Sequence, residues 1–266
     1  MNQPSIKLGR TASFALLFFL PAPIVVIAAT SFAAAGYLRF PPGELSLRWY
    51  AEAATDPRWI EAFVTSLSIA AVVALATTTV AFAGAYACHR LQPRWLPAFE
   101  VAVMSPLFFP HAALGVALVN VFAMTGHLGT ATGIAVAHIV CTLPFAWRPV
   151  AVALHRIDPE IVEAASLLGA DERRIALGIA LPLVRSGLVT ALLFTFIISF
   201  DEVTVTMFLA GPQVTTLPVQ IYAFIQENAS PVLAAISTAT VVLTLAVVVL
   251  LERLIGLEFF VANDPA

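Results

Sequence analysis

Two adjacent carboxylates in an apolar stretch are the residues of this sequence best placed to do chemistry. Asp201 and Glu202 lie inside the apolar stretch 186–209. If that stretch crosses a membrane, an acid there costs about 2.5–3.5 kcal/mol on insertion scales, so it usually faces a cavity or a partner. Lys and Arg are absent from the depth of the other apolar stretches, so a basic partner would have to come from another subunit. We therefore predict that both acids line the path of a cationic solute, although adjacent helical residues point about 100° apart and Glu202 can face elsewhere.

Aromatic and imidazole side chains also lie in the apolar stretches, and they could bind a cation or transfer protons. Phe200 precedes the acids, and the face of its ring could contact an amine through a cation–π interaction, although a lone aromatic in a span more often packs. His111 and His138 could relay protons in an ion-coupled transporter. We expect them instead to be buried, neutral and bonded to backbone carbonyl groups.

Catalytic and metal-binding readings find little support. Ser186-Gly187 is the only Ser-Gly pair, and no histidine lies near it in the sequence, which disfavours a serine hydrolase. Cys88 and Cys141 form no CxxC or Cys/His ligand spacing, so neither a disulfide framework nor a metal site is predicted. We expect both cysteines to pack as small hydrophobic residues.

The amino-acid composition indicates that the polar residues described above lie in a membrane protein. Of 266 residues, 60% are hydrophobic and 11% are charged, whereas soluble domains have roughly 45–50% and about 25%. The net charge of −3 suggests no nucleic-acid partner. We predict an all-α integral membrane protein in which residues 1–266 form a single transmembrane domain in contact with lipid.

Six stretches are long enough to cross a bilayer, which needs about 20 mostly apolar residues. They are 12–35, 63–87, 98–123, 129–147, 186–209 and 231–251. The fourth is the weakest because Pro144 and His138 interrupt it. We read Pro106, Pro110 and Pro144 as kinks. We also predict a short interfacial helix at 46–54 and a helix that begins at Pro57 after an Asp56 cap.

Basic residues predict the orientation, because cytoplasmic loops carry an excess of Lys and Arg. With the N-terminus inside, only Arg39, Arg48 and Arg58 lie outside. The predicted cytoplasmic set is Lys7, Arg10, Arg90, Arg94, Arg148, Arg156, Arg173, Arg174, Arg185 and Arg253. Both termini are therefore predicted to be cytoplasmic, and the first apolar stretch is read as a retained helix rather than a cleaved signal peptide.

Two short amphipathic helices are predicted in the cytoplasmic segment 158–182. Asp158 caps the first, Pro159 begins it, and Gly169 fits the left-handed residue that ends it. Asp171 caps the second, which Pro182 stops. The apolar stripe of the first helix is Ile161, Ala164, Ala165 and Leu168. Small alanines bury little area against lipid but permit close approach, which favours docking into a protein groove.

This segment resembles the EAA loop of ABC-importer permeases. The resemblance lies in Glu163-Ala164-Ala165, Gly169 and Ile179-Ala180-Leu181-Pro182. It implies the type I permease fold and makes the segment a coupling helix seated in a cytoplasmic ATPase. Glu163 would then face the ATPase, Ala164 and Ala165 would form the contact face, Gly169 the turn, and Pro182 the end of the motif.

Other segments resemble the spermidine/putrescine branch of that family. They are Ser46–Tyr50, Ser66–Ala70, Ser199–Glu202, Ala210-Gly211-Pro212 and Thr216-Leu217-Pro218. The resemblance implies a bacterial inner-membrane subunit that imports a small organic cation. A ferric ion, thiamine, phosphonate or amino-acid derivative is the alternative cargo. An ion-coupled secondary transporter is a weaker alternative, because no two related halves are visible.

The resemblance also implies partners. They are a second permease subunit, two copies of a cytoplasmic ATPase and an extracytoplasmic substrate-binding protein. The chain has no G-x-x-x-x-G-K-[ST] phosphate loop. We therefore expect it not to be an enzyme and to hold no cofactor, with ATP and Mg²⁺ bound by the separate ATPase.

Overall fold

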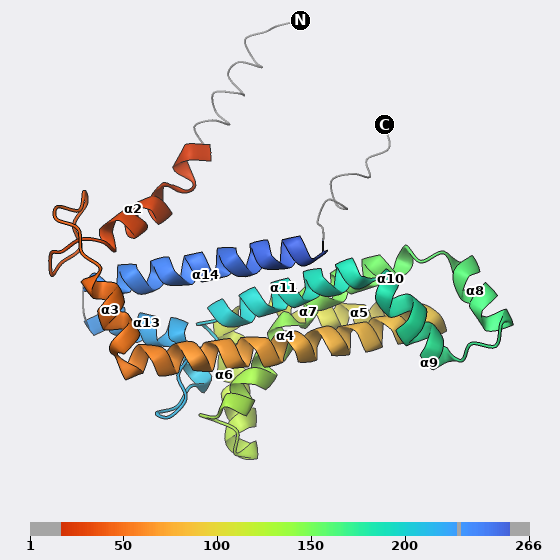
Figure 1. Cartoon of the computed structure of the whole chain (residues 1–266). Coiled ribbons are helices and arrows are strands. Elements are labelled where there is room, and N and C mark those ends of the chain that lie inside the picture. Colours follow the sequence, from red (N-terminus) through yellow and green to blue (C-terminus); the bar gives the residue numbers. More distant parts are fainter. Residues whose placement is uncertain (1–16, 228–229, 256–266) are drawn as a thin grey trace, which may run out of the picture. The chain divides into compact units, whose positions relative to one another are not determined.

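The computed structural model describes residues 17–227 and 230–255, and every regular element in these ranges is a helix (Figure 1). The chain divides into two compact units. The described residues 17–60 and 223–246 belong to one, and 61–222 and 247–255 belong to the other. Each unit is described by itself below.

The first unit contains the predicted interfacial helix. It holds α2 (Ala22–Thr30), α3 (Arg48–Thr55), the start of α4 (Pro57–Leu91), the end of α13 (Leu217–Glu227) and most of α14 (Val232–Ile255). The indole Nε1 of buried Trp49 donates to the carbonyl oxygen of Ala33 at 2.8 Å, which fixes α3 to the preceding segment. Asp56 caps α4, because its Oδ1 accepts the backbone N–H of Arg58 at 2.9 Å. The two predicted helices and the Asp56 cap are confirmed, with α3 at Arg48–Thr55 rather than 46–54, whereas the interfacial position of α3 stays a prediction.

The second unit is built around three helices. The remaining elements here are α5 (Leu96–Met104), the 3₁₀ turn η1 (Ser105–Phe108), α6 (His111–Thr125), α7 (Ala131–His155), α8 (Pro159–Leu167), α9 (Glu172–Ile175), the π turn η2 (Ala176–Ala180), α10 (Leu181–Leu183), α11 (Arg185–Asp201) and α12 (Thr206–Leu209). One buried cluster joins α4, α7 and α11, which run side by side (Figure 1). A Cβ added to Gly187 would lie 2.7 Å from the Pro149 carbonyl oxygen, so only glycine permits this approach of α11 to α7.

Both cysteines lie in the hydrophobic core of this unit. Cys88 packs in the cluster that joins α4, α7 and α11, and Cys141 packs in a second cluster with Ile69 and Val205. Both are buried and free. The prediction that they act as small hydrophobic residues is confirmed.

Three helices in the described residues are long and apolar enough to span a membrane alone. They are Pro57–Leu91, Ala131–His155 and Val232–Leu250. Counting each of two bent pairs as one span raises the number to five. The apolar helical segment Leu17–Thr30 is shorter, and residues 12–16 of the predicted first span lie outside the described residues, as do Lys7 and Arg10. The predicted count of six therefore remains a prediction.

The third predicted span, 98–123, is not one helix. The segment Leu96–Phe108 and the helix His111–Thr125 meet at an angle of 106°. Two prolines explain the break. Pro106 lies in a 3₁₀ turn, and Pro110, which cannot donate a helical hydrogen bond, holds Phe109 in an extended conformation. Reading both prolines as kinks within one helix was therefore wrong.

The fourth and fifth predicted spans also need correction. The fourth, 129–147, was rated weakest, yet α7 runs unbroken through Pro144 and Pro149 to His155. Neighbouring helices bury one side of α7, which stabilises it despite the missing donors. The fifth, 186–209, stops as a helix at Asp201, and Glu202 is extended. Its N-terminal end bends by 73° at Val184 into the helical segment Glu172–Leu183.

Candidate functional site

The first predicted site, the segment 158–182, folds as two capped helices. Asp158 Oδ1 accepts the backbone N–H of Glu160 at 3.0 Å, and Asp171 Oδ1 accepts that of Arg174 at 2.8 Å. Gly169 adopts the left-handed conformation with φ of 84° between them. The sequence predictions of both caps and of the turn are therefore confirmed.

The first of these helices, α8, presents an uncovered face. Glu163 and Ala164 are exposed, and Ala165 is half-buried. Leu167 and Leu168 are 86% and 89% exposed, which is unusual for leucines outside lipid. Leu167 was not among the residues singled out from the sequence, because it falls outside the stripe at helical spacing. Within the described residues nothing packs on this face, so it is free to receive a partner.

The second helix does not stop before Pro182. The helical path Glu172–Leu183 includes Pro182, and the preceding residues Ala176–Ala180 form a π turn. Proline cannot donate to the carbonyl four residues earlier, and its ring would collide with that turn of an α-helix. The wider π turn relieves this collision. The expectation that Pro182 ends the helix is therefore wrong by one residue, because the helix ends at Leu183.

The second predicted site lies at the end of α11 rather than inside a longer helix. Asp201 is the last helical residue and its side chain is exposed. Glu202 is 8% exposed, and both of its carboxylate oxygens have partners in the chain. Oε2 lies 2.9 Å from His111 Nδ1, and Oε1 accepts the backbone N–H of Val205 at 2.8 Å. The two acids therefore have different environments, as their angular separation allowed.

His138 connects the two sides of the break after α11. Its Nδ1 lies 2.8 Å from Ser199 Oγ, and its Nε2 lies 2.8 Å from Thr206 Oγ1. Because the Thr206 hydroxyl donates to the Glu202 carbonyl oxygen, it accepts from His138. If the ring is neutral, its proton lies on Nε2, and Ser199 donates to Nδ1.

The histidine partners differ from the sequence expectation. Backbone carbonyl partners were expected for His111 and His138, whereas both bond to side chains. His111 is also half-exposed rather than buried. The reason is the interruption of two helices, which brings the polar groups of α6, α7, α11 and α12 within reach of the rings. No pattern in the sequence predicted these contacts between the histidines and other side chains.

Phe200 lies among other aromatic rings. It is 4% exposed, stacks on Phe196 with ring centroids 5.9 Å apart, and meets Phe63 edge-on at 6.2 Å. The Phe200 ring is therefore enclosed by neighbours. This favours packing over direct contact with a solute.

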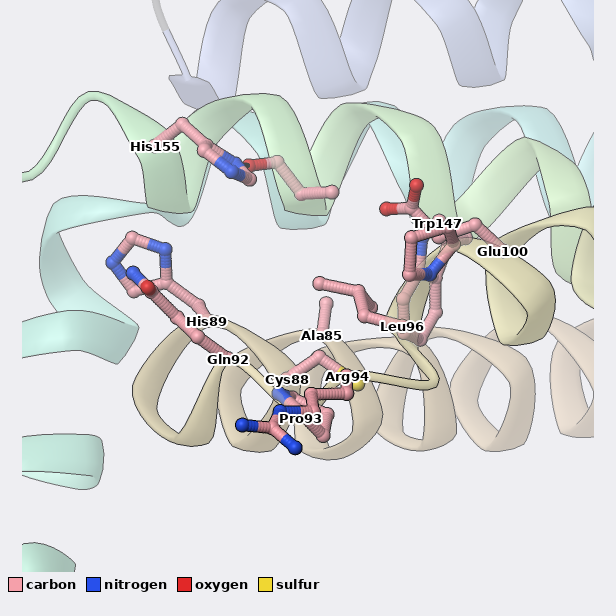
Figure 2. A pocket seen from close by; sticks show the side chains of 12 residues that line it. Ala85, Cys88, His89, Gln92, Pro93, Arg94, Leu96, Glu100, Trp147 and His155 are labelled. Carbon is pink, nitrogen blue, oxygen red and sulfur yellow. Dashed lines mark hydrogen bonds between the residues drawn. The ribbon is translucent and has the colours of Figure 1, made fainter.

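A cavity of about 380 Å³ opens between the ends of α4 and α7 and the start of α5 (Figure 2). His89 and His155 meet edge-to-face at one end of it, with ring centroids 5.2 Å apart. Glu100 and buried Trp147 lie at the other end. No motif in the sequence indicated this cavity. Among the described residues, no cluster of His, Cys, Asp or Glu is arranged to hold a metal ion.

Comparison with known proteins gives a consistent result. Residues 80–257 match the family described as "Binding-protein-dependent transport system inner membrane component". The spermidine/putrescine permease PotC of Haemophilus influenzae is 30% identical over 237 residues, which cover 89% of this chain and 92% of that protein. The putrescine permease PotI of Escherichia coli is 28% identical over 228 residues, covering 83% and 80%.

A solved structure shares the fold. It is a bacterial alginate ABC transporter in complex with an alginate pentasaccharide-bound periplasmic protein, and one of its chains matches with a TM-score of 0.73. The match covers 98% of this chain and 96% of that one at 15% identity, so it shows the architecture alone. Since the family match covers more than half of the chain and agrees with the fold, this chain belongs to the binding-protein-dependent transport system inner-membrane components and is an ABC-importer permease subunit, not an enzyme.

Proposed function

We propose that this permease forms half of the translocation path for a small organic cation, a polyamine such as spermidine or putrescine. The observation that carries the proposal is the similarity to polyamine permeases along most of both chains. The position of Asp201 supports it independently.

Asp201 offers an ammonium group two kinds of acceptor. Its carboxylate is exposed at the last residue of α11. The last carbonyl groups of a helix lack helical partners and carry the negative end of the helix dipole. Under the predicted orientation this helix end lies in the outer half of the membrane, where a desolvated cation arriving from outside needs compensation. Discontinuous helices serve ion sites in this way in other transporters.

Glu202 and Phe200 support the same path through hydrogen bonding and packing, rather than by contacting cargo. Both carboxylate oxygens of Glu202 are engaged by His111 and Val205, so it holds the α11–α12 break in place. Phe200 packs against the rings of Phe63 and Phe196. Of the three, Asp201 alone has an exposed polar group that can meet cargo.

The segment 158–182 couples this path to ATP hydrolysis in another chain. Glu163, Ala164 and Ala165 form the face offered to a cytoplasmic ATPase, together with Leu167. Gly169 sets the angle between the two helices, and Pro182 with the π turn shapes the segment that leads into α11. ATP and Mg²⁺ would be bound by the ATPase.

The complete importer would then contain several chains. We expect a second permease, identical or different, two ATPase subunits and an extracytoplasmic binding protein. The whole of residues 1–266 would act as one permease domain in the bacterial inner membrane, with both termini in the cytoplasm. No nucleic acid is involved.

Uptake of radiolabelled spermidine into proteoliposomes containing the complete importer tests this function. Asp201→Asn should reduce uptake several-fold while basal ATP hydrolysis is retained. The matched control is Glu61→Gln, which also removes one exposed carboxylate near the predicted outer surface. Unlabelled putrescine should compete, whereas 2-aminoethylphosphonate, the solute named for a 26% identical relative, should not. Equal uptake by Asp201→Asn and wild type would exclude the role of this acid. No spermidine uptake by wild type would exclude the cargo.

A further inference from the structure

Three side chains join the segment 158–182 to the end of α4. The hydroxyl of Tyr86 donates to Glu172 Oε1 at 2.6 Å. Arg90 donates to the same carboxylate twice, from Nε to Oε1 at 2.8 Å and from Nη2 to Oε2 at 3.2 Å. Tyr86 and Arg90 are one helical turn apart on α4, so their side chains emerge on the same face.

This cluster contributes little to overall stability. The Arg90 and Glu172 side chains are 33% and 56% exposed, and water screens ion pairs of this exposure. Its geometry is nevertheless specific, since a guanidinium that donates twice to one carboxylate fixes both position and orientation. A contact that adds little stability but fixes geometry is suited to positioning.

The place of the cluster in the chain suggests what it positions. The face of α8 that would meet an ATPase is free, and the turn at Gly169 connects it to Glu172 at the start of α9. Beyond Glu172, this helical segment buries Ile175 and Ala180, and Ala180 lies in one buried cluster with Ala85 of α4. Apolar burial is non-directional, so it does not by itself fix the register of this segment against α4. The hydrogen bonds of the ionic cluster are directional and would fix that register.

We propose that Tyr86, Arg90 and Glu172 form a latch that fixes the ATPase-coupling segment to α4. This inference rests on the coupling role proposed above. Displacement of α8 would move α9 and the end of α4 together, and α11 would follow through its connection at Val184. Without the latch, part of the movement would be lost between α9 and α4, and ATP would be hydrolysed without transport. These are positioning residues, because they would act through the segment 158–182.

The test measures spermidine molecules transported per ATP hydrolysed in the reconstituted importer. Arg90→Gln and Glu172→Gln should each lower this ratio several-fold, mainly by lowering transport. Tyr86→Phe should lower it less, because it removes one of three bonds and keeps the stacking on Phe82. The double variant Arg90→Glu with Glu172→Arg should restore much of the ratio, which a general loss of folding would not allow. Arg94→Gln, a charge loss four residues further along, should behave as wild type.

A second measurement does not depend on cargo or ATPase. Amide hydrogen exchange in residues 172–180 should be faster in Arg90→Gln and Glu172→Gln than in wild type, and slower again in the double variant. An unchanged ratio and unchanged exchange in both single variants would overturn the latch. If Glu163→Lys lowers the ratio but the latch variants do not, the coupling role stands and the latch is wrong. If wild type shows no coupled transport of spermidine while exchange responds as expected, the proposed function fails instead.

Discussion

Glu202 illustrates how a carboxylate can lie buried in this unit without a Lys or Arg partner. It accepts from a histidine ring and from the backbone N–H of Val205. The Val205 N–H has no helical acceptor because α11 ends at Asp201. The Glu202 carboxylate accepts its hydrogen bond in place of a backbone carbonyl group. A buried carboxylate held by such bonds belongs to the architecture of the break, whereas Asp201 beside it remains available.

The difference between these acids leads to a prediction for Glu202. Glu202→Ala should destabilise the protein by about 1–3 kcal/mol, because it leaves the Val205 amide and the His111 ring without their partner. Glu202→Gln should cost less, since an amide oxygen can still accept from Val205. Thermal unfolding of the purified permease measures both, with Asp201→Ala as the exposed control. Equal loss in Glu202→Ala and Asp201→Ala would show that the observed bonds contribute nothing.

At the scale of elements, the turn at Gly169 determines how α8 is presented. A Cβ at this position would meet nothing within 4 Å, so substitution there is not a matter of space. Its φ of 84° is the only obstacle, and a residue with a Cβ pays about 1–2 kcal/mol in this region. The turn can therefore be tested without disturbing packing.

Gly169→Val should uncouple ATP hydrolysis from transport while the permease inserts and folds. Gly169→Asn is the matched control, because asparagine tolerates the left-handed region, and it should retain most coupling. The ratio of transported spermidine to hydrolysed ATP distinguishes them. Full coupling in Gly169→Val, and likewise in Glu163→Lys, would show that the segment is only a linker.

The latch between α4 and α9 should not respond to cytoplasmic pH. The hydrogen bonds from Arg90, and then that from Tyr86, hold the pKa of Glu172 below its ordinary value. A lowered folded-state pKa gives a contribution that is fully present above the unfolded pKa, about 4.3, and is lost as pH falls through the folded value. The difference in amide-exchange protection of residues 172–180 between wild type and Glu172→Gln should stay constant from about pH 6 to 8 and shrink only below about pH 4. A decrease near neutral pH would contradict the assignment.

At the scale of the whole molecule, the orientation decides which face meets ATPase and which meets the binding protein. After replacement of Cys88 and Cys141 by alanine, single cysteines can be placed at Glu44 and at Leu167, both on exposed segments. A membrane-impermeant maleimide should label position 44 in intact spheroplasts and position 167 only after permeabilisation. The opposite pattern would invert the topology and move the segment 158–182 to the outer face.

Assembly is the second question at this scale. The chain carries no phosphate loop, so the purified permease should hydrolyse no ATP alone and should transport only with its ATPase and binding protein. Co-expression with the neighbouring genes and size measurement of the complex provide the check. Transport by the permease alone would contradict this assembly and favour an ion-coupled secondary transporter.

The features that the sequence determined are those governed by local chemistry. Hydrophobic composition required lipid or deep burial for most of the chain. Asp158, Gly169 and Asp171 specified their caps and turn, because a short acceptor or a left-handed conformation acts on neighbours within a few residues. Adjacent carboxylates also identified the region around the α11 break, although not its shape.

Tertiary structure alone decided where the apolar stretches break and which polar groups meet. The prolines at 106 and 110 produce a sharp bend, while Pro144 and Pro149 leave α7 unbroken. The same residue type gives opposite outcomes because buried neighbours support α7. The pairing of His111 with Glu202 and of Arg90 with Glu172 spans more than 80 positions of sequence. Such contacts depend on how helices pack against one another, and periodicity within a single stretch carries no information about that.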